Sequence, residues 1–86
     1  MDKEEIFGKI LQEERKAKNI SQEKLAKLTG LDRTFISLIE NGKRSPTFST
    51  ILKICLALEI DPSELFSIYE KKDPEYHVKK GGKHAK

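Results

Sequence analysis

Residues 30–46, GLDRTFISLIENGKRSP, decide the fold that this sequence predicts. Asp32 offers a side-chain oxygen that can cap a helix beginning at Arg33. Asn41 and Gly42 come at the other end of the run, and both residue types tolerate the left-handed conformation that ends many helices. The stretch therefore predicts a short helix that begins at Arg33 and ends near Asn41.

The two faces of this helix differ in chemistry. At 100° per residue, Ile36 and Ile39 point to one side, and Phe35 and Glu40 lie at its margins. The outer face carries donors of moderate length, one guanidinium and one apolar group: Arg33, Thr34, Ser37, Leu38 and Asn41. A face that merely met water would hold Glu and Lys, whereas these groups suit the base edges in a DNA groove.

Another predicted helix, from Gln22 to Thr29, lies directly before this one. The turn between them contains Gly30, and two short helices joined by such a turn are the helix-turn-helix signature. Ala26 is small where the two helices would cross. Gln22 begins the first helix of the pair, where its amide could reach a phosphate or a base edge.

Hydrophobic periodicity along the whole chain predicts five short helices and no strand. The remaining three are a first helix ending at Asn19, a fourth over Phe48–Leu58 and a fifth over Pro62–Ile68. A chain of 86 residues suffices for one small domain. We therefore expect an all-α fold, a compact five-helix domain over residues 1–68.

Three of the helix starts share one local device. Ser21, Asp32 and Asp61 each follow an apolar residue and precede another one four positions later, which is a capped helix start with a hydrophobic staple. At the third start, Pro62 takes the first helical position and Glu64 can complete a capping box. We expect all three caps to form.

Composition points to the cytoplasm. The single cysteine, Cys55, permits no intrachain disulfide, which favours a reducing compartment. It shares a helical face with Ile51 and Leu58, so we expect it in the core. The N-terminus MDKEEIF has acids where a signal peptide has bases. The longest apolar run, ICLAL, is too short to span a bilayer, so we expect no membrane partner.

The net charge of +3 lies in the C-terminal part of the chain. Residues 69–86 contain six lysines and three acidic residues, whereas residues 1–68 contain 11 basic and 11 acidic ones. Pro74 and a Gly-Gly pair interrupt this last segment, so we expect a basic, flexible tail. Two alternatives stay open: an arm that touches phosphates, or packing of Tyr76–Val78 on a partner chain.

The sequence contains no catalytic motif. It lacks a nucleophile elbow, a Gly-rich phosphate loop and paired histidines with a carboxylate at ligand spacing. Short helices also leave little room for a deep pocket. His77 and His84 have no acid or cysteine cluster beside them, so we expect no metal site. We expect neither an enzyme nor a cofactor.

Residues from about Ile6 to Phe66 resemble the lambda-repressor-like, XRE-type helix-turn-helix domains of phage repressors and bacterial regulators. The motifs that carry the resemblance are SQEKLAKLTGLDRTFISLIENGKRSPT and LKICLALEIDPSELF. LDRTFIS also looks like the controller proteins of restriction-modification systems. The resemblance implies a transcriptional regulator that binds double-stranded DNA, and a small-molecule inducer is not indicated. Because one helix reads few base pairs, we expect a homodimer on a palindromic operator.

The resemblance also implies roles for single residues. Residues matching those that contact bases or nearby phosphates are Gln22, Arg33, Thr34 and Ser37. Phe35 matches a residue that packs on the DNA backbone, and Asn41, Lys43 and Arg44 match a phosphate-binding loop. Leu38 shares the outer face, although it is apolar where such domains are usually polar, as is Leu28. Arg15 and Glu40 match an internal salt bridge. Thr47 can cap the fourth helix, whose N-terminus could bind a phosphate.

The dimer surface and one competing function complete the predictions. The apolar residues near the end of the domain favour a dimer surface with four members: Leu65, Phe66, Ile68 and Tyr69.

The competing function is a protein-interaction module of the same fold, of the antitoxin or bridging-factor kind, with secondary DNA binding. Leu28, Leu38 and the tail could serve it. Taken singly, each of the three bases Arg33, Lys43 and Arg44 could simply form a solvated surface.

Overall fold

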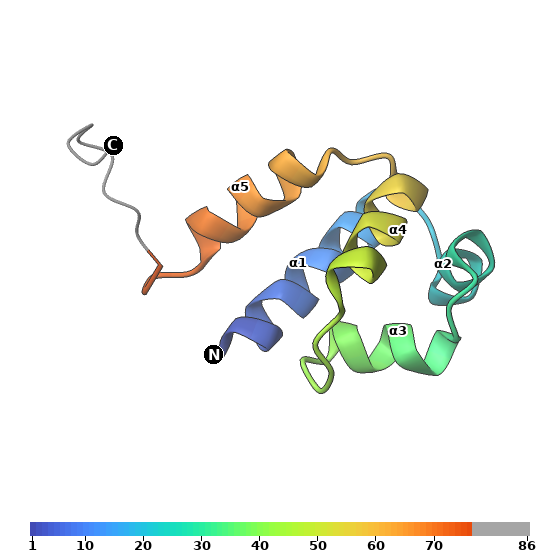
Figure 1. The fold of residues 1–86 in the computed structure, drawn as a ribbon, viewed down its shortest axis with the longest axis horizontal. Helices are drawn as coiled ribbons and strands as arrows, with labels where there is room; N and C mark the ends of the chain where they lie inside the picture. Colours follow the sequence, from blue (N-terminus) through green and yellow to red (C-terminus); the bar gives the residue numbers. More distant parts are fainter. Residues whose placement is uncertain (77–86) are drawn as a thin grey trace.

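A computed structural model of the chain describes residues 1–76. These residues form five helices and no strand (Figure 1): α1 (Lys3–Ala17), α2 (Gln22–Thr29), α3 (Arg33–Glu40), α4 (Phe48–Leu58) and α5 (Pro62–Lys72). The predicted all-α class is therefore confirmed. The predictions for the last ten residues, including those for His77 and His84, lie outside the described part of the chain.

Helix α1 lies at the centre of the fold, with α3 along one side and α5 along the other (Figure 1). Helix α2 packs on α3 and α4, and α4 packs on α5. The inner faces of all five helices meet in one apolar core. Its most deeply buried side chains are Leu11, Leu25, Ile36, Ile39, Ile54, Cys55, Leu58 and Leu65. Burial raises the pKa of the Cys55 thiol above its ordinary value, in keeping with a core position.

The local sequence signals at the two ends of the helices act largely as expected. The side chain of Ser21 accepts a hydrogen bond from the Lys24 N–H at 3.0 Å, so α2 begins where predicted. Asn19 adopts the left-handed conformation with φ 58° just after α1. One cap was not predicted: Asp2 and Glu5 form a reciprocal capping box at the start of α1.

The predicted cap at Asp61 is wrong. Its side chain makes no capping hydrogen bond, and Glu64 completes no capping box. Pro62 occupies the first turn, as predicted, and its ring fixes a backbone angle that suits a helix start. The helix start is held instead by the flanking apolar pair, because Ile60 and Leu65 are both buried.

Helix α5 is longer than predicted. It continues past Ile68 to Lys72, so the predicted helix end is wrong and the predicted domain boundary at residue 68 falls within α5. The reason is tertiary. The Asp73 side chain, only 3% exposed, accepts hydrogen bonds from Lys3 Nζ at 2.9 Å and from the Tyr69 hydroxyl at 2.6 Å. This cluster ties the end of α5 to the start of α1.

Candidate nucleic-acid interface

The turn between α2 and α3 is built by Thr29 and Gly30. Gly30 has φ 76°, a left-handed conformation that glycine adopts without steric cost. The Thr29 hydroxyl donates to the Leu25 carbonyl at 2.7 Å and accepts from the Leu31 N–H at 3.2 Å. The side chain of Asp32 then accepts from the Thr34 N–H at 3.0 Å and caps α3. The chain therefore enters α3 in a defined direction.

Helix α3 has one buried face and one open face, as the sequence predicts. Ile36 and Ile39 are 0% and 1% exposed, which anchors the helix in the core. Arg33 and Thr34 are exposed near its N-terminal end. Farther along the outer face, Ser37 and Leu38 are half-buried and Asn41 is exposed. The helix thus presents a polar ridge whose side chains are not walled in by the rest of the protein.

A buried ion pair lies directly behind this ridge. Arg15 of α1 donates from Nε to Oε2 of Glu40 at 2.7 Å and from Nη2 to Oε1 at 3.1 Å. Arg15 also donates to the Ile20 carbonyl at 2.7 Å. Both side chains are almost completely buried, so the structure contains the pair that the sequence led us to expect. Removing one partner of such a pair leaves a buried charge without compensation.

Gln22 connects this buried pair to the surface. Its side-chain nitrogen donates to Glu40 Oε1 at 2.9 Å, and its side-chain oxygen accepts from Nη1 of Arg33 at 3.2 Å. The amide is half-buried between α2 and α3. Gln22 therefore does not extend freely from the start of α2, as the sequence suggested it could.

The loop between α3 and α4 carries two exposed bases, Lys43 and Arg44. The guanidinium of Arg44 lies 5.4 Å from the ring centroid of Phe35, in a cation–π contact. Phe35 is half-buried against the core, so its ring supports the loop as well as lining the surface. Gly42, with φ 74°, provides the left-handed turn that starts the loop.

The N-terminus of α4 adjoins the same loop. Thr47 caps this helix, since its hydroxyl oxygen accepts from the Thr50 N–H at 3.2 Å. The next residue, Phe48, is 71% exposed, although a large aromatic side chain would normally be buried. Thr47 and Phe48 thus begin α4 directly after the loop that carries Lys43 and Arg44.

An exposed apolar stripe along α4 was missed in the sequence. Phe48, Leu52 and Leu56 recur at every fourth position and are all exposed, Leu56 at 82%. The available signal was an excess of apolar residues. Helix α4 contains more apolar residues than its inner face can bury. That face is occupied by Ile54, Cys55 and Leu58.

The four predicted dimer residues do not share one environment. Leu65 is only 1% exposed, because it packs into the core of its own chain, so its assignment to a dimer surface is wrong. Phe66 is 44% exposed, and Ile68 and Tyr69 are half-buried. Three of the four side chains therefore remain at least partly exposed to solvent.

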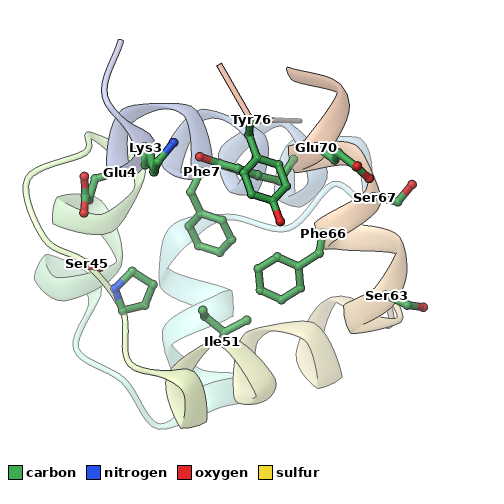
Figure 2. Close-up of a pocket in the computed structure, with 12 residues that line it drawn as sticks. Lys3, Glu4, Phe7, Ser45, Ile51, Ser63, Phe66, Ser67, Glu70 and Tyr76 are labelled. Atoms are coloured by element: carbon green, nitrogen blue, oxygen red, sulfur yellow. The ribbon is translucent and has the colours of Figure 1, made fainter. Parts of the chain in front are cut away.

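Phe66 borders an open groove of about 710 Å³, which we call the α1–α5 groove. The rings of Phe7 and Phe66 lie side by side in the middle of its lining, with centroids 6.5 Å apart, and Tyr76 extends toward them (Figure 2). Ile51 lies opposite, on α4. The sequence predicted little room for a deep pocket, and this feature is a surface groove between α1, α4 and α5.

Two short helices, a glycine turn between them and a polar ridge on the second define a helix-turn-helix protein. The chain belongs to the helix-turn-helix family, whose model matches residues 11–65. It is 48% identical to the control protein C.MunI of Mycoplasma sp over 66 residues, which cover 76% of this chain and 89% of that protein. The predicted resemblance to XRE-type domains and controller proteins is therefore confirmed.

Solved structures agree with this assignment. The restriction-modification controller protein C.AhdI from Aeromonas hydrophila has a TM-score of 0.71 at 48% identity, covering 73% of this chain and 96% of that one. The controller protein C.Esp1396I, solved as a tetramer in complex with its natural 35 base-pair operator, has a TM-score of 0.77 at 29% identity, covering 84% and 95%.

Proposed function

We propose that this chain is a sequence-specific DNA-binding transcriptional regulator that binds a palindromic operator as a homodimer, with α3 in the major groove. The observation that carries the proposal is the polar ridge of α3, open to solvent at Arg33 and Thr34 and anchored by Ile36 and Ile39. The similarity to C.Esp1396I, which was solved on its operator, supports the same function. The proposal includes a cytoplasmic location and no enzymatic activity.

The outer face of α3 would read base edges. Arg33 can donate two bonds to guanine, Thr34 and Ser37 can bond most base edges, and Leu38 can cover a thymine methyl. The α3–α4 loop would hold the phosphates through Asn41, Lys43 and Arg44. These contacts position the protein, whereas base contacts give it specificity.

The first turn of α4 would add a phosphate contact. Its free N–H groups and the positive end of the helix dipole attract anions. Helix α4 is 11 residues long, and its cap Thr47 accepts a hydrogen bond from one N–H of the first turn, that of Thr50. Phe48 would lie against the sugar-phosphate backbone next to this contact.

A homodimer would place two copies of α3 on half-sites about 34 Å apart, one turn of the duplex. Its surface would include Phe66, Ile68 and Tyr69, together with the α1–α5 groove that Phe66 borders. Leu65 has no part in it. Sedimentation that showed only monomers at tens of micromolar would contradict this part of the proposal.

The function is tested by selection from a random duplex pool. The expected result is an enriched sequence with two-fold symmetry, and recovery of the pool without enrichment would contradict it. Binding to the selected duplex should also weaken steeply with salt. The log–log slope should be about −0.9 for each phosphate that is neutralised.

A second function is favoured by the apolar stripe of Phe48, Leu52 and Leu56, together with Leu28, which is 50% exposed. Exposed apolar patches mark protein-interaction sites. A protein-interaction module would use this surface and bind DNA only secondarily. Tight binding of a protein partner, with weak duplex binding that selects no sequence, would favour this second function.

A further inference from the structure

The Asp73 cluster fixes the turn that follows α5. The carboxylate of Asp73 accepts hydrogen bonds from Lys3 at the start of α1 and from the hydroxyl of Tyr69 in α5. It also accepts from the Glu75 N–H at 2.9 Å, and the Tyr76 N–H donates to the Asp73 carbonyl at 3.2 Å. One side chain that is only 3% exposed therefore joins the first helix, the last helix and the turn behind it.

This turn directs Tyr76 toward the α1–α5 groove. The ring of Tyr76 meets that of Tyr69 edge-on, with centroids 6.3 Å apart, and extends toward the rings of Phe7 and Phe66 (Figure 2). Tyr76 is 43% exposed and Phe66 is 44% exposed, so the chain itself covers only part of each ring. Large aromatic side chains of this kind are enriched where proteins associate. The cluster thus enlarges the aromatic surface of the groove.

The charges beside the groove indicate which partner fits it. Lys3 and Glu4 are neighbours at the start of α1, both line the groove and both are exposed. A two-fold axis places the same surface on both copies, so an apolar patch with charges of both signs beside it can be self-complementary. A strongly acidic or basic partner would instead require charges of one sign. The groove therefore fits a second copy of the chain.

We infer that Tyr76 belongs to the surface on which two copies of the chain associate, and that Asp73 is the positioning residue that holds it there. The inference rests on the proposed homodimer, to which it adds a residue beyond the last helix. A side chain that is fixed before association loses less conformational freedom when the copies meet. For one such side chain, the gain in affinity is roughly twofold to tenfold.

The test measures dimer dissociation of the full-length chain by analytical ultracentrifugation at neutral pH. The variants are Tyr76→Ala, Asp73→Asn and the two combined. Tyr69→Phe weakens the cluster in a second way, because it removes only the hydroxyl that donates to Asp73. Glu75→Gln is the matched control, since it removes one negative charge from the same turn and keeps the backbone N–H. Thermal unfolding checks that each variant folds.

A spectroscopic signal tests the turn separately from association. The chain contains two tyrosines, Tyr69 and Tyr76, and no tryptophan. Near-UV circular dichroism in the tyrosine region therefore reports on this part of the molecule. Asp73→Asn should reduce the tyrosine signal, whereas Glu75→Gln should leave it unchanged. An unchanged signal in Asp73→Asn would show that Asp73 does not hold the turn, and would overturn the inference.

Tyr76→Ala should raise the dissociation constant of the dimer on the order of tenfold, because buried aromatic anchors carry much of the binding energy at interfaces. Asp73→Asn and Tyr69→Phe should raise it by roughly twofold to tenfold, and Glu75→Gln should not change it. In the Tyr76→Ala background, Asp73→Asn should have no further effect.

Two results would overturn the inference while leaving the homodimer in place. If Asp73→Asn weakens association equally in both backgrounds, Asp73 acts through the fold and not through Tyr76. If Tyr76→Ala associates as the unaltered chain does, Tyr76 lies outside the surface. An unaltered chain that is monomeric at every concentration would refute the proposed homodimer, and this inference with it.

Discussion

Gly8 of α1 lies against the backbone of Ile39 in α3 so closely that only a residue without a side chain fits there. A Cβ on Gly8 would overlap the Ile39 carbonyl oxygen and lie 2.7 Å from that of Glu40. Backbone atoms of a packed helix cannot move aside cheaply. This contact sets the distance between the central helix and the helix with the polar ridge, and brings Arg15 within reach of Glu40.

We expect Gly8→Ala to destabilise the fold by about 1–3 kcal/mol, since overpacking against backbone forces the helices apart. In a helix without this contact, the same change would stabilise by about 1 kcal/mol. Chemical denaturation measures the difference. Gly30→Ala is the control: a Cβ there meets nothing within 4 Å, but φ 76° should cost about 1 kcal/mol in strain. A more stable Gly8→Ala variant would contradict the close packing.

Arg33→Ala should weaken binding to the selected duplex by about 1–3 kcal/mol and relax discrimination at one base pair. The reason is the loss of a directed pair of donors at the N-terminal end of α3. Titration of duplexes changed one base pair at a time measures it. Equal weakening on all duplexes would instead identify Arg33 as a phosphate contact.

The double variant Lys43→Ala/Arg44→Ala should weaken binding to all duplexes alike and reduce the salt slope by roughly two units, because two phosphate contacts are lost. Binding measured over a range of salt concentrations gives the slope. Lys9→Ala/Lys53→Ala removes the same charge from exposed positions on α1 and α4. If both pairs change the slope equally, the loop has no special role.

Phe66→Asp should shift the protein toward monomers, since it places a charge on the dimer surface that we propose. Analytical ultracentrifugation over a range of concentrations measures the shift. Leu56→Asp introduces the same charge on the apolar stripe of α4, where the side chain is 82% exposed. Dissociation by Leu56→Asp and not by Phe66→Asp would move the dimer surface to α4.

Asp73 should make stability depend on pH in the acid range. Its hydrogen bonds from the Tyr69 hydroxyl and Lys3, and from the Glu75 N–H, lower its pKa from 3.8 to about 2. Because the folded-state pKa is depressed, the stabilisation is fully present well above pH 3.8 and is lost as the pH falls through about 2. Asp73→Asn should therefore be less stable than the unaltered chain at neutral pH.

The stability difference between Asp73→Asn and the unaltered chain should narrow between pH 4 and pH 2. Denaturation curves at several pH values measure it. Asp61→Asn, at a carboxylate that makes no capping hydrogen bond, is the control for charge alone. A difference that stays constant down to pH 2 would show that the Asp73 cluster does not act through ionisation.

Most of the helix-turn-helix could be predicted because its signals are local. Ser21 and Asp32 cap helices that begin at the next residue, and Gly30 ends α2, all within one or two turns of chain. The inward side of α3 followed from helical period alone. The predicted Asp61 cap does not form, and the start of α5 has Pro62 in its first turn with the buried Ile60 and Leu65 on either side.

The surface was harder to predict. Period places Leu65 and Phe66 on adjacent sides of α5, but it does not say which side another helix covers. Leu65 is buried and Phe66 is 44% exposed because α5 lies across α1, a contact between the two ends of the sequence. Helical period likewise does not tell which side of α4 is covered, so it could not predict that Leu56 is exposed.

By itself, the sequence determined where the helices begin and end around the turn and which side of α3 carries the polar residues, since caps and helical period act over a few residues. Only the tertiary structure decided how far α5 extends, which apolar residues stay exposed and that Gln22 joins Glu40 to Arg33. Those outcomes depend on contacts between residues far apart in the chain, which no local pattern encodes.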